Sequence, residues 1–319
     1  MARHQRPTTI VTSSVTTNMT TNVTSNVTTS VTSNDPIALM NVAAAIARRA
    51  GDTITIGRRS GDRRAHTKST PTDMVTVWDA RSEEQIVTEL SERRPHDGIV
   101  AEEGSARPSS SGVSWLVDPI DGTTNFLYGM AGFAVSIAAV DDAGRSLAGA
   151  VFLPMTRELF VAARGHGAWL AGRRLQCSAT TDLAQALVGT GFAYDAELRR
   201  RQGVRLAALV GSVRDIRRVG AAAPDLCYVA DGRLDAYFEE NLQVWDVAAG
   251  RLIAEEAGAL VTSFDGGPAD PSRLLAATPG IHSPLVDLLR DAESPRDAEL
   301  PRDAELLWDA GRTTDFPAT

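Results

Sequence analysis

Hydrophobic residues recur at helical spacing in several stretches of the chain. Apolar side chains follow Asp35 at intervals of three or four residues, which predicts an amphipathic helix capped by that aspartate. A second stretch with this spacing is followed by Pro95, which favours a helix that has already ended. Helices are predicted over residues 37–46, 82–94, 221–229 and 247–257.

Shorter apolar runs predict strands between these helices. Residues 133–140 and 148–153 flank the turn sequence Asp141–Gly144, as in a hairpin. Further strands are predicted over residues 115–117, 187–190 and 260–264. Strands and helices interleave without strict alternation, so we expect an α/β protein of layered sheets and helices and not a purely doubly wound sheet.

Both ends of the chain have biased composition. Residues 8–34 are almost entirely Thr, Ser, Asn and Val, a low-complexity segment that we expect to be disordered. Three Arg-Asp-Ala-Glu repeats begin at Arg290, Arg296 and Arg302, too few and too short for a solenoid. The predicted organisation is a tail over residues 1–34, a folded domain over 35–290 and an acidic tail over 291–319.

Composition narrows the class of protein. The formal net charge of −8 disfavours a nucleic-acid or lipid-binding protein, and no apolar stretch approaches the roughly 20 residues of a membrane span. The start of the chain lacks the apolar segment of a secretory signal, so we expect a cytoplasmic protein. Two cysteines and five scattered histidines leave carboxylates as the ligands of any metal, which indicates Mg²⁺, Mn²⁺ or Ca²⁺.

One stretch joins carboxylates to a possible anion site. An apolar strand delivers Asp118 and Asp121, Pro119 fixes the backbone between them, and Gly122 and Thr123 follow near a probable helix start. Free N–H groups at such a start suit a phosphate. Two acids beside an anion require a cation between them. The alternative interpretation is an ordinary Asp-Pro-x-Asp-Gly turn.

Two other acidic positions fit the same site. Glu102 and Glu103 follow the apolar run Gly98–Ala101, and Asp246 opens a predicted helix of small residues. Taken singly, the glutamates are also typical of a solvated pair, and Asp246 of a helix cap.

Taken together, these motifs resemble the inositol monophosphatase family. The family pattern has an Asp, then paired Glu, then Asp-Pro-Ile-Asp-Gly-Thr, then Trp-Asp-x-Ala-Ala-Gly. Here these stand at Asp79, Glu102–Glu103, Asp118–Thr123 and Trp245–Gly250, and the resemblance covers residues 35–290. It implies a sandwich of alternating α-β-α-β-α layers, with sub-regions of about 35–180 and 181–290 that meet at a metal-binding cleft.

The resemblance also implies roles for individual residues. The implied metal ligands are Glu102, Asp118, the carbonyl of Ile120, Asp121 and Asp246. The implied substrate contacts are Ile120, Asp121, Gly122, Thr123, Gly220, Ala221, Ala222, Glu239 and Asp246. The implied catalytic set is Glu102, Thr123 and Asp79, in which Asp79 holds Thr123 and the two orient the attacking water. Two or three Mg²⁺ ions, with Mn²⁺ as a substitute, are the implied cofactors.

The implied activity is Mg²⁺-dependent, lithium-sensitive hydrolysis of inositol 1-phosphate by a homodimer. Histidinol phosphate, fructose 1,6-bisphosphate and adenosine 3′,5′-bisphosphate remain alternative substrates, because the motifs bind metal and phosphate, which all these esters share. An interaction protein with a secondary metal site remains an alternative of another class, suggested by the two tails.

Overall fold

The computed structural model describes residues 34–60, 65–67 and 74–292. The expectations for the Thr/Ser/Asn-rich segment and for the acidic repeats beyond Ala292 lie outside these residues. Asn34, which the sequence assigned to the first tail, contacts the folded part: its Nδ2 donates to Ser111 O at 3.1 Å and its Oδ1 accepts from Arg94 Nη2 at 2.8 Å.

A large mixed sheet holds eight strands in the order β10-β9-β8-β7-β6-β5-β3-β4. Neighbouring strands are antiparallel except β3 and β5, which run parallel. The strands are β3 (Gly98–Ala101), β4 (Ala106–Arg107), β5 (Val113–Asp121), β6 (Ala134–Asp141), β7 (Ser146–Leu153), β8 (Glu158–Ala163), β9 (Gly167–Leu170) and β10 (Arg173–Arg174).

A smaller sheet holds five strands in the order β12-β11-β13-β15-β14. Strand β11 pairs in parallel with both β12 and β13, whereas β15 is antiparallel to β13 and β14. The strands are β11 (Leu187–Thr190), β12 (Asp215–Arg217), β13 (Ala236–Glu240), β14 (Leu260–Ser263) and β15 (Arg273–Ala277). A 3₁₀ turn, η1 (Leu183–Gln185), precedes β11.

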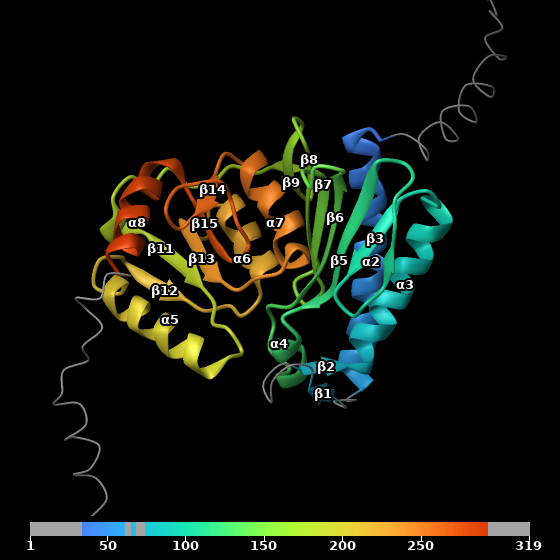
Figure 1. Ribbon diagram of the computed structural model, residues 1–319, viewed down its shortest axis with the longest axis horizontal. Coiled ribbons are helices and arrows are strands. Elements are labelled where there is room, and N and C mark those ends of the chain that lie inside the picture. The colour runs from blue at the N-terminus through green and yellow to red at the C-terminus, as the bar shows by residue number, and fades with distance from the viewer. Residues whose placement is uncertain (1–33, 61–64, 68–73, 293–319) are drawn as a thin grey trace, which may run out of the picture. The chain divides into compact units, whose positions relative to one another are not determined.

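Helices cover both sheets and separate them, which gives the expected α-β-α-β-α layers (Figure 1). Helices α2 (Pro36–Ser60) and α3 (Val77–Arg93) cover one face of the large sheet. Helices α6 (Ala222–Ala230) and α7 (Val244–Glu256) lie between the sheets, and α5 (Ala196–Leu209) and α8 (Pro279–Asp291) lie beyond the small one.

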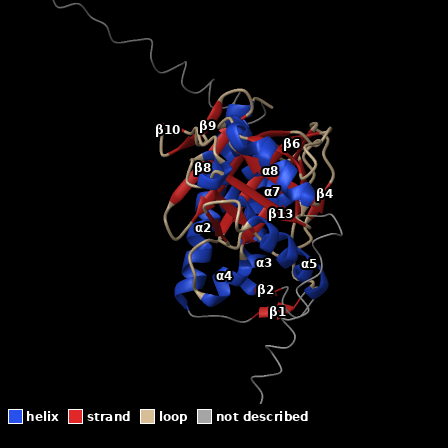
Figure 2. Ribbon diagram, turned by 90° about the vertical axis from the view of Figure 1, so that its left-hand side faces the viewer, coloured by secondary structure: helices blue, strands red, loops and turns tan. Residues whose placement is uncertain are grey.

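A short helix and a two-stranded hairpin lie next to each other at the edge of the folded part. Helix α4 (Thr123–Tyr128) lies beside the hairpin of β1 (Ala65–Thr67) and β2 (Met74–Thr76) in both ribbon views (Figure 2). Within the described ranges, no helix has the length and apolar character needed to cross a membrane.

Small residues let helices pack closely on both faces of β7. A Cβ added at Gly51 of α2 would lie 2.2 Å from the Phe152 ring, and one added at Gly149 of β7 would lie 3.0 Å from Ala249 of α7. Apolar clusters therefore fill the spaces between layers, as close-packed interiors require.

The predicted strands are all present, but two helices begin earlier than their apolar pattern predicted. Helix α3 begins at Val77 and not at Ser82, because Thr76 and Asp79 form a capping box. Helix α7 begins at Val244 and not at residue 247, and Asp246 accepts from Gln243 N at 2.8 Å. Asp246 therefore stands three residues inside the helix as the second member of a capping box.

Candidate active site

A β-bulge brings Asp118 and Asp121 to one face of strand β5. Asp118 pairs with Ser136 and Asp121 pairs with Ala134. Between these pairs the chain advances three residues along β5 but only two along β6. In a regular strand, residues three apart point to opposite faces. The extra residue cancels that alternation, so both carboxylates are directed to one region.

The neighbouring parallel strand brings Glu102 to the same edge. Ala101, the last residue of β3, pairs with Val117, and Glu102 N donates to Val117 O at 3.1 Å. Glu102 and Asp118 therefore directly follow a pair of opposing residues on two adjacent parallel strands. The carboxyl ends of parallel strands are a common position for ligand sites.

A buried glutamate on α3 fixes the turn that follows Glu102. Glu83 is 4% exposed and accepts from Glu103 N at 2.7 Å and from Ser105 N at 3.0 Å. The sequence did not indicate this role, because Glu83 and this turn approach each other only in the folded chain.

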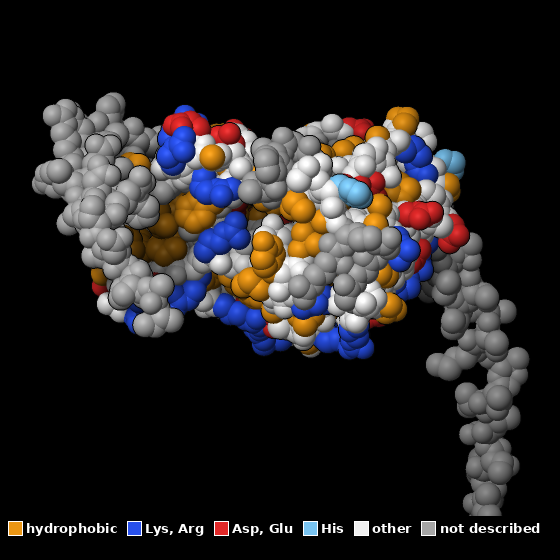
Figure 3. Space-filling view, turned by 90° about the horizontal axis from the view of Figure 1, so that it is seen from below, with side chains coloured by type: hydrophobic (Ala, Val, Ile, Leu, Met, Phe, Trp, Pro, Cys, Tyr) orange, Lys and Arg blue, Asp and Glu red, His pale blue; other side chains and the backbone are white. Residues whose placement is uncertain are grey.

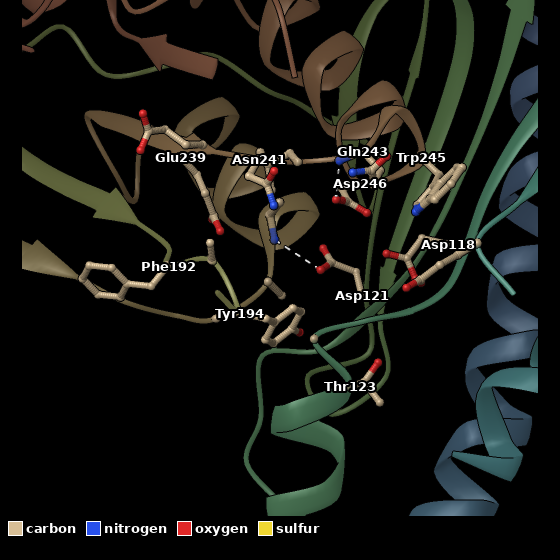
Figure 4. A pocket seen from close by; sticks show the side chains of 18 of the residues that line it. Asp118, Asp121, Thr123, Phe192, Tyr194, Glu239, Asn241, Gln243, Trp245 and Asp246 are labelled. Atoms are coloured by element: carbon tan, nitrogen blue, oxygen red, sulfur yellow. Dashed lines mark hydrogen bonds between the residues drawn. The ribbon is translucent and has the colours of Figure 1, made fainter. Parts of the chain in front are cut away.

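The carboxylates line one cavity of about 410 Å³. Asp118, Asp121 and Asp246 point toward a common space in Figure 4, with Asp246 arriving from the first turn of α7. Every predicted metal or substrate residue lines the cavity: Glu102, Asp118, Ile120, Asp121, Gly122, Thr123, Gly220, Ala221, Ala222, Glu239 and Asp246. Asp79 lies behind its wall.

Asp79 reaches the cavity through Thr123. It is fully buried, caps α3 through Thr76 N at 2.8 Å, and accepts from Thr123 Oγ1 at 3.0 Å. The carbonyl of Ile120 lies equally close to this hydroxyl, at 3.0 Å, so its single hydrogen serves one acceptor at a time. Burial raises the pKa of Asp79 to about 6, although the bonds from Thr76 oppose the shift.

Asp121 joins the two sides of the cavity. Its carboxylate accepts from Ala222 N at 3.3 Å and Ala223 N at 2.6 Å, and it thereby caps helix α6. Asn125 makes a second connection, donating from Nδ2 to Val219 O at 2.9 Å and Gly132 O at 2.8 Å. The backbone of Gly220–Ala222 therefore lies against the strand-end carboxylates.

The carboxylates in this cavity oppose one another's ionisation. Burial raises the pKa of Asp118 well above its usual range, and Glu102, Asp121 and Asp246 add to the shift. Burial likewise raises the pKa of Asp121 to about 7, against the opposing bonds from α6, and that of Glu239 to about 7. Several acids gathered away from water favour either protonation or a compensating cation.

The donor set fits a hard divalent cation. Its side-chain donors are carboxylate oxygens, which suit Mg²⁺ or Mn²⁺ better than a soft metal. Within the part of the chain that the structure describes, no three Asp, Glu, His or Cys side chains already form a closed metal-binding group.

Comparison with known proteins agrees with this geometry. Residues 35–294 match the model of the inositol monophosphatase family. The chain belongs to that family. A Mycobacterium tuberculosis protein named inositol-1-monophosphatase SuhB is 44% identical over 280 residues, which cover 81% of this chain and 95% of the relative.

Two further relatives of this family member differ in how they are named. A Pasteurella multocida protein named Nus factor SuhB is 41% identical over 247 residues, covering 76% of this chain and 92% of that protein. The crystal structure of extragenic suppressor protein suhB from Bartonella henselae has a TM-score of 0.75 at 37% identity, and the match covers 79% of this chain and 98% of that chain. Family membership supports a phosphatase that is metal-dependent, as the family generally is.

The cavity of this inositol monophosphatase family member has walls that the sequence analysis did not assign. Phe192, Tyr194 and Arg218 line one side, and Asn241 and Gln243 line another. Arg218 lies two residues before Gly220 and Gln243 lies three residues before Asp246, and this closeness to assigned residues was the available signal. Their proximity to the carboxylates depends on the packing of the small sheet, α6 and α7 against the large sheet.

Proposed function

We propose that the protein is a Mg²⁺-dependent phosphomonoesterase that converts inositol 1-phosphate and water into inositol and phosphate. The supporting observation is the cavity that Glu102, Asp118, Asp121 and Asp246 line together, with Gly122 and Thr123 at its wall. A phosphate dianion does not bind beside bare carboxylates, so a cation must join them.

In this proposal, metal and substrate share the cavity. The carboxylates of Glu102, Asp118, Asp121 and Asp246 and the carbonyl of Ile120 hold Mg²⁺. When bound, Mg²⁺ neutralises phosphate charge, acidifies a water molecule and stabilises the departing alkoxide. The remaining substrate contacts are Gly122 and Thr123 to phosphate, and Gly220, Ala221, Ala222, Glu239 and Asp246 to polyol hydroxyls.

Thr123, Asp79 and Glu102 orient the attacking water. Thr123 donates its hydroxyl hydrogen to Asp79. The lone pairs of the Thr123 hydroxyl oxygen are then free to accept a hydrogen bond from water. Glu102, at the adjacent strand end, accepts a second hydrogen of that water. The water oxygen bonds to phosphorus as the ester oxygen departs with a proton, so the step needs no covalent enzyme intermediate.

The decisive experiment measures phosphate release from inositol 1-phosphate, histidinol phosphate, fructose 1,6-bisphosphate and adenosine 3′,5′-bisphosphate, with Mg²⁺, Mn²⁺ or EDTA. We expect metal-dependent turnover with inositol 1-phosphate preferred. Asp118→Asn and Asp246→Asn should lower kcat/KM by roughly 1,000-fold, since lost metal-ion catalysis is worth several kcal/mol. Normal turnover in both variants contradicts the proposal. If another ester is preferred, that ester is the substrate in place of inositol 1-phosphate.

A matched control comes from an exposed aspartate. Asp142 lies in the turn between β6 and β7, at the end of β6 opposite Asp121. Asp142→Asn removes the same charge and should leave turnover unchanged.

Three finer properties belong to the same proposal: inhibition by millimolar Li⁺, a homodimer and a cytoplasmic location. Li⁺ titration of the steady-state rate tests the first, and mass photometry tests the second. Fractionation of the native cells tests the third. Undiminished rate in Li⁺, a monomer mass or a non-cytoplasmic fraction contradicts the respective property.

A second candidate function is an interaction role, favoured by relatives that are named Nus factors. Asp118→Asn separates the two functions. Loss of turnover with unchanged capture of a partner supports the interaction role, whereas parallel loss of both ties the role to the metal site.

A further inference from the structure

One wall of the carboxylate-lined cavity is a short loop, residues 191–195, which connects β11 to α5. Residues 192–195 of this loop all line the cavity. Phe192 and Tyr194 lie on the side of the cavity away from Asp118 (Figure 4). The loop therefore belongs to the substrate side of the cavity and not to the proposed metal site.

Side-chain packing alone does not fix the position of this loop. Phe192 and Tyr194 also line a second cavity, of about 460 Å³, together with Arg199 and Arg218. Tyr194 is 42% exposed. A side chain that borders two cavities has fewer atoms in contact with it than a core side chain has. The position of the loop therefore depends on its backbone hydrogen bonds.

Two side chains of α5 hold both polar groups of the Ala193 backbone. Ala193 N donates to Gln202 Oε1 at 2.9 Å, and this bond is buried. Ala193 O accepts from Arg199 Nε at 3.0 Å, and Arg199 Nη2 donates to Tyr194 O at 3.3 Å. Helix α5 therefore fixes the loop that precedes it.

Gln202 occupies a position where a helix usually buries an apolar side chain. Among the described residues of α5, Gln202 and Leu209 are the two that are buried. The helix lies low in Figure 1, and the view from below in Figure 3 shows arginine and hydrophobic side chains intermixed on that face. Burying an amide costs free energy unless the amide is hydrogen-bonded. A glutamine at this position therefore indicates a specific bond and not apolar packing.

Gln202 also adjoins Glu239, which lines the substrate side of the large cavity. Both residues line a small cavity of about 10 Å³, beside Arg205 and Glu240. Arg205 Nη1 pairs with Glu240 Oε2 at 2.7 Å, and both side chains of this pair are mostly buried. Gln202 is therefore next to two separate walls of the substrate side, the loop and Glu239.

We propose that Gln202 is a positioning residue for the substrate side of the active cavity. Through the Ala193 backbone it holds Phe192 and Tyr194 in the place where the leaving group of the ester binds. This inference rests on the proposed function. If the loop leaves its place, only the fraction of molecules with the loop in position binds the ester, and the apparent affinity falls by that fraction.

The test replaces Gln202 with methionine, which has a similar length but only a weak acceptor. Gln202→Met should raise KM for inositol 1-phosphate roughly tenfold, through the loss of one buried hydrogen bond, and leave kcat within about twofold. The inhibition constant of inorganic phosphate, measured with Mg²⁺, should stay within about twofold, because the proposed phosphate contacts Gly122 and Thr123 lie on the large-sheet side. Arg201→Met, one residue away on the exposed surface of α5, is the matched control and should change none of these constants.

Hydrogen exchange at the Ala193 amide, measured by NMR, tests the contact without catalysis. We expect exchange at least roughly tenfold faster in Gln202→Met and unchanged in Arg201→Met. Arg199→Met removes only the donors to the loop carbonyls, which lie nearer the surface, and should raise KM by about threefold.

Three results overturn the inference: unchanged exchange at Ala193 in Gln202→Met, faster exchange with an unchanged KM, or equal rises in KM and in the phosphate inhibition constant. The last result assigns Gln202 to the stability of the whole fold. If Gln202→Met does not fold, an unchanged KM in Arg199→Met overturns the inference. Absence of inositol 1-phosphate turnover in wild type contradicts the proposed function instead, and the exchange measurement does not depend on that turnover.

Discussion

The two sides of the catalytic cavity are built in different ways. On the large-sheet side, Glu102, Asp118 and Asp121 stand at the ends of paired strands, where the hydrogen-bond ladder and a bulge set their directions. On the small-sheet side, Glu239 is the next-to-last residue of β13 and Asp246 lies in the first turn of α7, and each carboxylate accepts one local hydrogen bond, from Tyr237 Oη and from Gln243 N respectively. The first side is therefore the more rigid scaffold for metal, and the second is the easier place to change substrate choice.

Glu83 holds the turn that follows Glu102, and changing it should have the largest effect on Mg²⁺ binding of any substitution that leaves the metal ligands intact. Glu83→Gln turns an amide NH₂ toward one of the two backbone N–H groups that the carboxylate accepts. Loss of such support for a metal ligand should weaken Mg²⁺ affinity and kcat/KM by about 10–100-fold. Calorimetric Mg²⁺ binding provides the measurement.

The neighbouring Glu84 is exposed and serves as the control for Glu83. If Glu84→Gln weakens Mg²⁺ binding as much as Glu83→Gln does, surface charge and not the buried contact explains the effect.

Asn125 connects the two sides of the cavity through its hydrogen bonds to Gly132 O and Val219 O, and changing it tests this connection. Asn125→Ala leaves the carbonyls of Gly132 and Val219 without this donor and should lower the free energy of unfolding by about 2 kcal/mol. Urea unfolding measures the change. Asn41→Ala, on the exposed surface of α2, should have almost no effect, and equal losses in both variants would rule out the connection as the cause.

Gly191 sharpens the comparison on the small-sheet side. A Cβ there would lie 1.8 Å from Glu239 Oε2, so Gly191→Ala must displace that carboxylate. We expect KM for inositol 1-phosphate to rise about tenfold with little change in kcat, as for lost ground-state binding. Gly203→Ala places a methyl group in open space on α5 and should leave KM unchanged. An unchanged KM in both variants removes Glu239 from substrate binding.

His282 probes the small-sheet side away from the cavity and has the smallest effect. Its ring is 7% exposed and contacts Thr262 Oγ1 at 2.9 Å, and burial lowers its pKa. The folded state therefore favours neutral imidazole, while the unfolded chain binds a proton below about pH 6.5, so stability falls as pH drops below that value.

Urea unfolding at pH 7.5 and pH 5.5 measures this contribution. His282→Gln should reduce the pH dependence of the unfolding free energy by about 1 kcal/mol or less. An identical pH dependence in wild type and variant contradicts the role of His282, and exposed His166→Gln is the control.

The central part of the candidate site, Asp118–Thr123, could be predicted from the sequence because its residues are close along the chain, whereas Asp79, Gly220–Ala222 and Glu239 followed only from the resemblance to the family. The apolar run before Asp118 predicted strand β5, and Gly122 predicted the turn that follows. Helix α5 was missed because its amphipathic pattern is weak and its surface is rich in arginine. Its cap, Asp195, which accepts from Leu198 N at 2.8 Å, was the available local signal.

The start of α3 was missed for a different reason. Asp79 and Glu83 are buried acids in positions where an amphipathic pattern predicts solvent. Their carboxylates accept buried hydrogen bonds from Thr76, Thr123 and the turn after Glu102 instead of facing solvent, so hydrophobic periodicity gave the wrong helix start. Thr76, three residues before Asp79, was the local capping signal.

The sequence by itself determined the layered α/β class, some of its strands and the carboxylates offered to a metal, because these depend on local periodicity and residue chemistry. Only the tertiary structure decided that Asp121 caps a helix 101 residues later, that Glu83 supports the turn after Glu102, and that Arg199 and Arg218 line a cavity beside the carboxylates. These arrangements arise because close packing brings distant segments together, and no local pattern encodes which segments will meet.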